Sequence, residues 1–236
     1  VDTININGTS AGSAVTFNGG DDNDIINVNS TGGATTANGG NGSDTFNVNG
    51  TGAGSTTTLN GGDGADIFNV KAIAGATTAN GGADSDTINV GSNAAGTVAN
   101  ASNNSGGRVD NIGASLTING DASGSDVLNV DDTGDGNANT GTLTLNTLTG
   151  LDMAGSITYN TIEALNVSLG GAGNTVNIRS TFSGTLTTLK TGGGVDTVNF
   201  GSTGPITLNA LAGKVVLDGQ GGSDSVNLDD TGDSTT

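Results

Sequence analysis

The sequence predicts an all-β protein, a parallel β-solenoid built from stacked coils of about 20–22 residues with two short strands per coil. Three observations predict this fold. Near-identical segments recur at that spacing, such as NGGNGSDTFNV at 38–48 and NGGDGADIFNV at 60–70. Each repeat holds two runs of alternating apolar and polar residues, the pattern of a half-buried strand. Only 32% of the residues are hydrophobic and 44 of 236 are glycine, which leaves too few apolar side chains for a broad core.

The first strand of each repeat follows an aspartate. Asp24, Asp44, Asp66 and Asp86 are 20 or 22 residues apart, and similar strands recur further along the chain. Stacking at about 4.8 Å pairs each strand with the copies above and below, which buries one apolar face that a single unit could not bury. The expected inward ladder is Ile26, Phe46, Phe68, Ile88 and Leu128. The expected outward ladder is Asn27, Asn47, Asn69, Asn89, Asn129, Asn199 and Asn227.

The second strand of each repeat carries threonine on its outer face. Threonine suits such a position because it is β-branched and polar. The expected members of this ladder are Thr16, Thr36, Thr58, Thr78 and Thr117, with Val98 as an interruption. The glycine-rich stretches between strands predict tight turns.

The regularity of the repeat divides the chain into two blocks. Residues 1–113 are predicted to form regular coils with an irregular loop near 91–113. Residues 114–236 are predicted to form variant coils, stacked continuously on the first block. They belong to a longer repeat of 98 residues, because SDVLNVDDTGD at 125–135 returns as SDSVNLDDTGD at 223–233. The chain starts inside the repeat, so we interpret it as a mature or excised piece of a longer protein.

Charge and composition restrict the function. The formal net charge is −18, and every acidic residue except Glu163 is an aspartate. Such a chain repels phosphate backbones and anionic lipid, and it has no apolar run long enough to span a bilayer, so we expect neither nucleic-acid binding nor a membrane span. Cysteine and histidine are absent, which excludes disulfides and the usual zinc ligands. Disorder is the alternative for this composition, but disordered linkers do not keep an apolar position in register.

Two segments carry the motif with the most specific chemistry. GGNGSDTF at 39–46 and GGDGADIF at 61–68 match the pattern GGxGxDxU, where U is apolar, so the chain resembles the RTX, or haemolysin-type, calcium-binding repeat proteins. In that family the glycine loops and the aspartates of stacked loops enclose Ca²⁺, which takes six to eight hard oxygen ligands. The resemblance implies metal ligands at Asp24, Asp44, Asp66, Asp86, Asp126, Asp196 and Asp224, together with Asp22 and Asp84, which replace motif glycines.

The chain also departs from that family. Its coils carry one glycine–aspartate loop instead of two, so we expect bound calcium to form a single row along one edge. The alternative is that these aspartates only stabilise turns by hydrogen bonding to their own backbone.

These features predict an extracellular or cell-surface structural protein, a calcium-stiffened shaft of an adhesin, surface layer or filament. The chain is loosely similar in style to the large repetitive solenoids of bacterial surfaces. Its end coils would expose unpaired strand edges, so we expect head-to-tail self-association into fibres. One alternative is a module that binds ice or a glycan through the Thr and Asn ladders. Another is the secretion and folding region of an RTX toxin or exoenzyme.

Enzymatic activity is not expected. The basic residues do not recur beside a distinctive acidic cluster in the sequence, and Glu163 is expected to be a surface residue and not a general acid. The basic residues are Lys71, Arg108, Arg179, Lys190 and Lys214.

Overall fold

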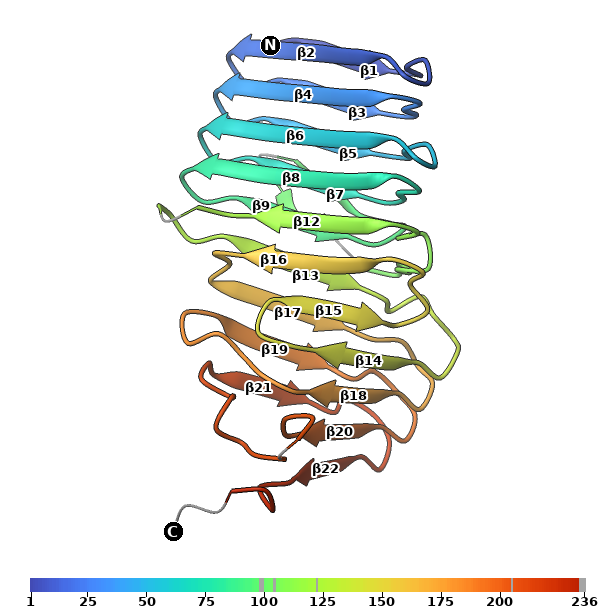
Figure 1. Cartoon of the computed structure of the whole chain (residues 1–236), viewed down its shortest axis with the longest axis vertical. Coiled ribbons are helices and arrows are strands. Elements are labelled where there is room, and N and C mark those ends of the chain that lie inside the picture. Colours follow the sequence, from blue (N-terminus) through green and yellow to red (C-terminus); the bar gives the residue numbers. More distant parts are fainter. Residues whose placement is uncertain (98–99, 104, 122, 205, 234–236) are drawn as a thin grey trace.

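The computed structural model describes residues 1–97, 100–103, 105–121, 123–204 and 206–233. In this part of the chain, two sheets face each other and their strands are stacked along the long axis of the molecule, from the N-terminal coil to the C-terminal coil (Figure 1). Nearly all neighbouring strands are parallel. The predicted all-β parallel solenoid is therefore confirmed. The described residues include no helix long and apolar enough to cross a membrane.

Sheet A has nine strands in the described residues, and every pairing within it is parallel. In spatial order these are β1 (Thr3–Ile6), β3 (Ile25–Val28), β5 (Thr45–Val48), β7 (Ile67–Val70), β9 (Thr87–Val90), β13 (Val127–Asp131), β17 (Ala164–Ser168), β19 (Leu186–Lys190) and β21 (Val215–Asp218).

Sheet B has eleven strands in the same residues. In spatial order these are β2 (Ala14–Asp21), β4 (Ala34–Asn41), β6 (Thr56–Asp63), β8 (Ala76–Ala83), β12 (Ser115–Asn119), β16 (Ser156–Asn160), β15 (Thr147–Gly150), β14 (Thr140–Leu143), β18 (Thr175–Ile178), β20 (Thr197–Phe200) and β22 (Ser225–Leu228).

The core is a narrow column of apolar side chains between the two sheets. All five members of the expected inward ladder have no exposed surface, which confirms that ladder. Phe46 and Phe68 lie on adjacent coils with ring centroids 4.7 Å apart and ring planes 7° from parallel. The core is one side chain deep on each sheet, so backbone pairing and polar ladders carry much of the cohesion.

Asparagine ladders line the outer faces. On sheet A, Asn27 Nδ2 donates to Asn5 Oδ1 at 2.8 Å and Asn47 Nδ2 donates to Asn27 Oδ1 at 2.9 Å. The series continues through Asn69, Asn89, Asn129 and Asn166. A second ladder on sheet B joins Asn18, Asn38, Asn60, Asn80, Asn119 and Asn160.

Two expected members of the sheet A ladder lie on the other sheet. Asn199 and Asn227 are in β20 and β22 of sheet B, where they continue a short ladder from Asn177. The hairpin of β14 and β15 adds two strands to sheet B between β16 and β18, but β17, which follows this hairpin in the chain, is still in sheet A. The change comes at Asn174, which follows the sheet A strand β17 and leads into β18 of sheet B.

The irregular segment near 91–113 leaves the stack and returns to it. It contains the antiparallel pair β10 (Ala95–Thr97) and β11 (Asn100–Asn103). The next strand, β12, pairs directly with β8, with Leu116 opposite Thr77 and Thr117 opposite Thr78. The threonine ladder is therefore in register across this segment, and Val98 lies outside the described residues.

Candidate metal centre

The first five predicted aspartates form one column at the edge where each sheet B strand leads into a sheet A strand. Asp24, for example, lies between β2, which ends at Asp21, and β3, which begins at Ile25. The side chains point into the corner and are at most 1% exposed. The members of this aspartate column are Asp24, Asp44, Asp66, Asp86 and Asp126.

Each carboxylate in the column binds the backbone of the preceding coil. The N–H of Asp24 donates to Asp44 Oδ1 at 2.7 Å, and the N–H of Asp44 donates to Asp66 Oδ1 at 2.7 Å. The same contact joins Asp66 to Asp86 and Asp86 to Asp126, each at 2.8 Å. One oxygen of each of these carboxylates, Oδ1, therefore accepts a hydrogen bond from a buried backbone N–H.

Glu163 is the next member of this series. The N–H of Asp126 donates to Glu163 Oε2 at 2.7 Å, and Glu163 is only partly exposed. This partly exposed glutamate, which we expected to be a surface residue, also occupies the place of the next aspartate in the column. Its longer side chain reaches the amide from a corner that has a different backbone path, with Thr161 at a φ of 51°.

The other carboxylate oxygen faces a glycine. A Cβ built on Gly61 would overlap Asp66 Oδ2 and the carbonyl oxygen of Gly81 in the next coil. Gly39 and Gly81 have the same relation to the aspartates five residues later. Among the described residues, the Oδ2 atoms of Asp24, Asp44, Asp66 and Asp86 are buried without a hydrogen-bond partner.

Burial makes these carboxyls hard to ionise. It raises the pKa of Asp66 to about 8 and the pKa of Asp86 to about 7, while the amide hydrogen bonds oppose the shift and the neighbouring carboxylates add to it. Burial also raises the pKa of Asp44 and Asp126. A buried carboxyl group with a raised pKa and one oxygen without a hydrogen-bond partner is stabilised either by a proton or by a bound cation.

The predicted single row is wrong, because the aspartates occupy two edges. Asp196 and Asp224 lie on the opposite edge, where a sheet A strand leads into a sheet B strand. The N–H of Asn174 donates to Asp196 Oδ1 at 2.6 Å, and the N–H of Asp196 donates to Asp224 Oδ1 at 3.0 Å. This second series already begins before the hairpin of β14 and β15, because the N–H of Asn139 donates to Asn174 Oδ1 at 3.0 Å.

Asp22 and Asp84 are exposed at the tips of their corners. Their φ angles of 79° and 76° are in the left-handed region, where the adjacent coils have Gly42 and Gly64. Aspartate tolerates this conformation better than most residues. Among the described residues, neither carboxylate belongs to a group of three that could hold a metal ion.

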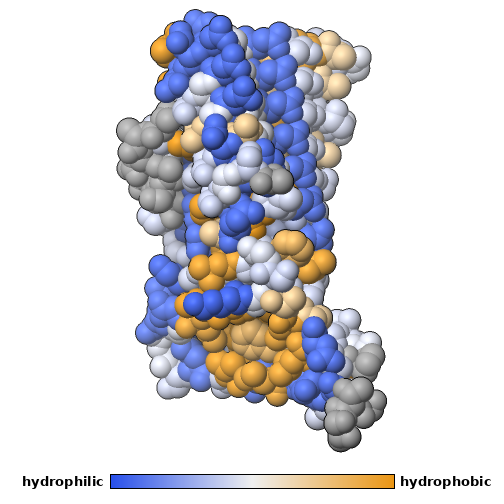
Figure 2. All heavy atoms as spheres, turned by 90° about the vertical axis from the view of Figure 1, so that its left-hand side faces the viewer, coloured by the Kyte–Doolittle hydropathy of each residue, from blue (hydrophilic) through white to orange (hydrophobic). Residues whose placement is uncertain are grey.

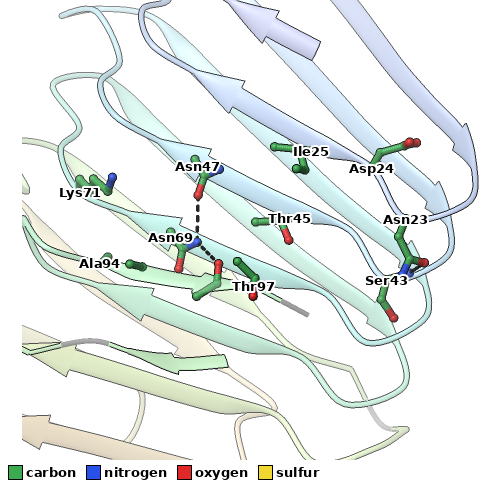
Figure 3. A pocket seen from close by; sticks show the side chains of 12 residues that line it. Asn23, Asp24, Ile25, Ser43, Thr45, Asn47, Asn69, Lys71, Ala94 and Thr97 are labelled. Atoms are coloured by element: carbon green, nitrogen blue, oxygen red, sulfur yellow. Dashed lines mark hydrogen bonds between the residues drawn. The ribbon is translucent and has the colours of Figure 1, made fainter. Parts of the chain in front are cut away.

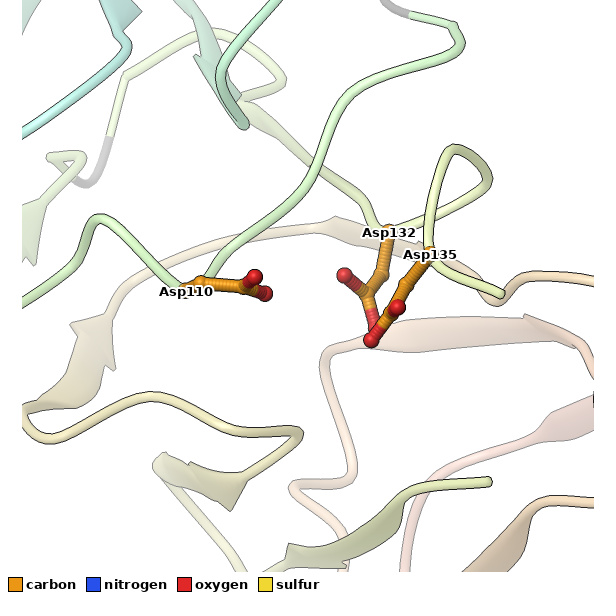
Figure 4. Close-up of side chains that lie close together, drawn as sticks. All are labelled: Asp110, Asp132 and Asp135. Atoms are coloured by element: carbon orange, nitrogen blue, oxygen red, sulfur yellow. The ribbon is translucent and has the colours of Figure 1, made fainter. Parts of the chain in front are cut away.

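A different group of acidic residues does meet that condition. Carboxylate oxygens of Asp110, Asp132 and Asp135 all lie within 4.8 Å of one another. Asp132 and Asp135 project side by side from the turn after β13, and Asp110 points toward them from the loop before β12 (Figure 4). Asp132 is 1% exposed and Asp135 is 3% exposed. This acidic triad could hold a metal ion.

Sequence reasoning identified only part of the triad. Asp132 and Asp135 belong to the repeated segment NVDDTGD, which was visible as a motif but was not linked to metal binding. Asp110 lies in the irregular loop, 22 residues before Asp132, and nothing in the local pattern indicates that the two segments meet. A third carboxylate from a non-repeating loop can be found only from the fold.

Buried polar groups surround the triad. The N–H of Val109 donates to Asp132 Oδ1 at 3.2 Å. Asn139 Nδ2 donates to Asp132 Oδ2 at 3.1 Å and to Asp135 Oδ2 at 2.7 Å. Asn139 is 3% exposed, and in the described part of the chain its Oδ1 and Asp110 Oδ1 are buried without a partner. The triad therefore offers carboxylate oxygens as ligands, and one of them, Asp110 Oδ1, has no partner among the described residues.

Arg108 offsets part of the negative charge. Its NH1 lies 3.6 Å from Asp110 Oδ2 and its NH2 lies 3.8 Å from Asp135 Oδ1. Our expectation that no basic residue stands beside a distinctive acidic cluster was therefore wrong for Arg108. One partly exposed guanidinium faces three carboxylates, so the site keeps a net negative charge.

The three carboxyls differ in acidity. Burial raises the pKa of Asp132 to about 7, and the charges of Asp135 and Asp110 add to this shift against the hydrogen bonds from Val109 and Asn139. For Asp135, burial also raises the pKa, but the hydrogen bonds from Asn139 and from backbone N–H groups, with the charge of Arg108, bring it below its ordinary value. A cation would replace the proton on Asp132.

A shallow groove of about 350 Å³ lies elsewhere, on the outer face of sheet A beside β10 (Figure 3). Asn69 Nδ2 donates to Asn47 Oδ1 at 2.9 Å and to the carbonyl of Gly96 at 2.9 Å, which attaches β10 to the ladder. Thr45 and Lys71 also line it. None of the described residues in its lining is aromatic, so none can stack on a sugar.

Comparison with known proteins gives no match to a family model, a curated protein or a solved structure.

Proposed function

We propose that this chain is a structural element, an extracellular β-solenoid shaft stiffened by calcium, and that the acidic triad is its main calcium site. The observation that carries this proposal is the position of the triad. The triad connects the irregular loop, at Asp110, to the turn at 131–135. The loop contacts this turn just before it returns to the stack at β12. A bound cation there would fasten the least regular segment to the regular coils.

The ligand set favours calcium over other common metals. The triad supplies carboxylate oxygens, and the chain has no histidine or cysteine for zinc or copper. Calcium accepts six to eight oxygens at 2.3–2.6 Å in flexible geometry, whereas magnesium demands a tight octahedron. Three carboxylates from two loops, with Asn139 beside them, suit the more permissive ion.

The aspartate columns are the second candidate for cation binding. Their unpartnered Oδ2 atoms lie beside glycine carbonyls of the next coil, and the resemblance to RTX repeats implies calcium at such corners. The amide hydrogen bonds to Oδ1 leave one oxygen per carboxylate for an ion or a proton. Counting bound ions in variants separates the triad from the columns.

The test compares the wild-type chain with Asp110→Asn. After EGTA treatment and transfer to buffer with about 0.15 M salt, which screens diffuse ion binding, calcium binding is measured by titration calorimetry and by elemental analysis. We expect wild type to bind at least one ion per chain and D110N to bind one fewer. At 100 times the dissociation constant, calcium should raise the melting temperature of wild type by about 5–10 °C.

Asp63→Asn is the matched control. Asp63 is exposed at the end of β6, and its partner in the adjacent coil is Asn41, so asparagine fits that position. D63N removes the same charge and should leave the number of bound ions unchanged. Equal ion counts in wild type and D110N would exclude the triad as the site.

A second candidate function is recognition of ice or a glycan by the outer face of sheet B. The threonine ladder there is in continuous register through Thr16, Thr36, Thr58, Thr78, Thr117 and Thr158. Ranks of threonine on a flat face favour ordered water or sugar hydroxyls. Thermal hysteresis of wild type and of Thr58→Tyr tests ice binding, and wild type without hysteresis excludes it.

A further inference from the structure

The turn and the loop around the triad each occur twice, the turn 98 residues apart and the loop 99 residues apart. The segment 131–135 faces 107–112, and in the second copy 229–233 faces 206–211. The N–H of Gly134 donates to the carbonyl of Gly107 at 2.8 Å, and the N–H of Gly232 donates to that of Ile206 at 2.8 Å. The backbone of the two copies is therefore arranged alike at the point where the loop meets the turn.

Other contacts repeat in the same way. Val109 N–H reaches Asp132 Oδ1 at 3.2 Å, and Leu208 N–H reaches Asp230 Oδ1 at 2.9 Å. Within the turn, the N–H of Asp135 donates to the carbonyl of Asp132 at 3.0 Å, and the N–H of Asp233 donates to that of Asp230 at 3.0 Å. The N–H of Thr133 donates to Asp131 Oδ1 at 3.1 Å, and the N–H of Thr231 donates to Asp229 Oδ1 at 3.0 Å. In the loop, the N–H of Arg108 donates to Ser92 Oγ and the N–H of Thr207 donates to Ser202 Oγ, both at 3.0 Å. By this match, Asn209 is the equivalent of Asp110 in the second copy, and Thr207 is the equivalent of Arg108.

The two copies differ in the side-chain contact between the loop and the turn. In the second copy, Asn209 Nδ2 donates to Asp233 Oδ2 at 3.1 Å, so an amide links the two segments directly. In the first copy, Asp110 is an acceptor only and cannot donate to Asp135. It adds charge to a site that already holds two buried carboxylates.

Arg108 makes a different link between the two segments. Its Nε donates to the carbonyl of Gly134 at 3.1 Å, but its two contacts with the triad carboxylates, at 3.6 and 3.8 Å, are longer than hydrogen bonds, and the side chain is about half exposed. It also leaves Asp110 Oδ1 and Asn139 Oδ1 without partners among the described residues. A cation between the carboxylates would satisfy Asp110 Oδ1 and make the connection that the amide of Asn209 makes in the second copy.

We propose that the residue at position 110 decides whether this recurring corner binds a divalent cation. Asp110 makes the first copy a site for an oxygen-preferring ion of the calcium class, and Asn209 makes the second an ion-free copy closed by a hydrogen bond. This inference rests on the proposed calcium site and adds to it the feature that distinguishes the two copies.

The first experiment converts the second copy into a site. We expect Asn209→Asp, in the full chain, to bind one calcium ion more than wild type in calorimetry and elemental analysis. Its affinity should be at least tenfold weaker than that of the first copy, because Asp230 is exposed and Asp233 is partly exposed, whereas Asp132 and Asp135 are buried. The double variant D110N/N209D should bind as many ions as wild type. Asn209→Ser, which removes the amide without adding charge, should gain none.

The second experiment does not depend on how Asn209→Asp folds. D110N gives the first copy the amide of the second and keeps Arg108, with its hydrogen bond from Nε to the Gly134 carbonyl. In EGTA we expect its melting temperature to equal or exceed that of wild type, since an amide replaces a repelled carboxylate, and in calcium we expect it to be lower than wild type. A lower melting temperature in EGTA overturns the inference.

The outcomes separate the inference from the calcium proposal. If wild type binds no calcium, or if D110N binds as much as wild type, the calcium site itself is refuted. If D110N loses an ion but a folded N209D gains none, or if N209S gains one, the site stands and the role assigned to position 110 is overturned.

Discussion

An aspartate and the glycine five residues before it form one packing unit in the corners. Asp66 Oδ2 occupies the space that a side chain at Gly61 would need, and Asp66 Oδ1 caps the amide of Asp44. The motif glycines were predicted as turn residues, but Gly61 and Gly62 belong to β6, which continues to Asp63. Glycine is needed here mainly because the carboxylate packs against the backbone.

We predict that Gly61→Ala lowers the free energy of unfolding by about 1–3 kcal/mol, since the new methyl group would force Asp66 and the Gly81 carbonyl apart. Urea unfolding measures the change. Gly8→Ala is the control, because a Cβ at Gly8 meets nothing within 4 Å, and it should change stability by less than about 0.5 kcal/mol. Equal effects of the two substitutions would contradict this packing role.

The asparagine ladders act as elements, because each inner amide both donates and accepts along the stack. Asn47 donates to Asn27 and accepts from Asn69, so it joins three coils. At the end of the ladder, Asn5 only accepts from Asn27 in the contact between them. The position of an asparagine in its ladder should therefore determine how much its amide contributes.

We predict that Asn47→Asp costs about 1–3 kcal/mol, because the carboxylate cannot donate to Asn27 and places a charge in a partly buried ladder. Asn5→Asp keeps its acceptor and should cost much less. Thermal unfolding of both variants checks this difference. Asn5→Asp with the larger loss would show that the ladder does not contribute by donor–acceptor matching.

The alternation of apolar and polar residues predicted most strands and which faces they bury. It did not predict the hairpin of β14 and β15, because an alternating strand has the same pattern in parallel and antiparallel pairing. Nor did it predict that the repeat passes to the other edge after β17, which places Asn199 and Asn227 in sheet B and Asp196 and Asp224 at the second edge. Local patterns therefore predicted the elements, and pairing over long sequence distances determined the sites.

The whole molecule has polar corners along its sides and exposed apolar side chains at its C-terminal end. Figure 2 shows apolar surface gathered toward the C-terminal coils, below a largely hydrophilic N-terminal half. In the last coil, Val226 is 48% exposed and Leu228 is 66% exposed, whereas Val198, the partner of Val226 one coil earlier, is 2% exposed. This end presents core positions and a free strand edge to a further layer.

We predict that the chain associates through this end as its concentration rises, because a second copy would cover these apolar side chains. Val226→Lys should abolish the association measured by sedimentation velocity. Val195→Lys is the control, since Val195 is 66% exposed in a turn at the side of the stack and should associate like wild type. Association unaffected by V226K would exclude this surface.

The sequence made the solenoid and the chemistry of its corners predictable, because both recur every coil. It could not predict the acidic triad, since Asp110 belongs to a loop that leaves the stack. The 98-residue repeat was visible in the sequence, but only the fold shows that its two turns face matching loops with Asp110 in one and Asn209 in the other. The distinctive site therefore lies where the repetition is broken.

The most direct test of the account is a crystallographic anomalous difference map of the full chain with calcium bound. The account predicts a peak between the carboxylates of Asp110, Asp132 and Asp135, about 2.3–2.6 Å from their oxygens, in a column of stacked coils. An ordered map of the same residues with no peak there, at saturating calcium, would contradict it.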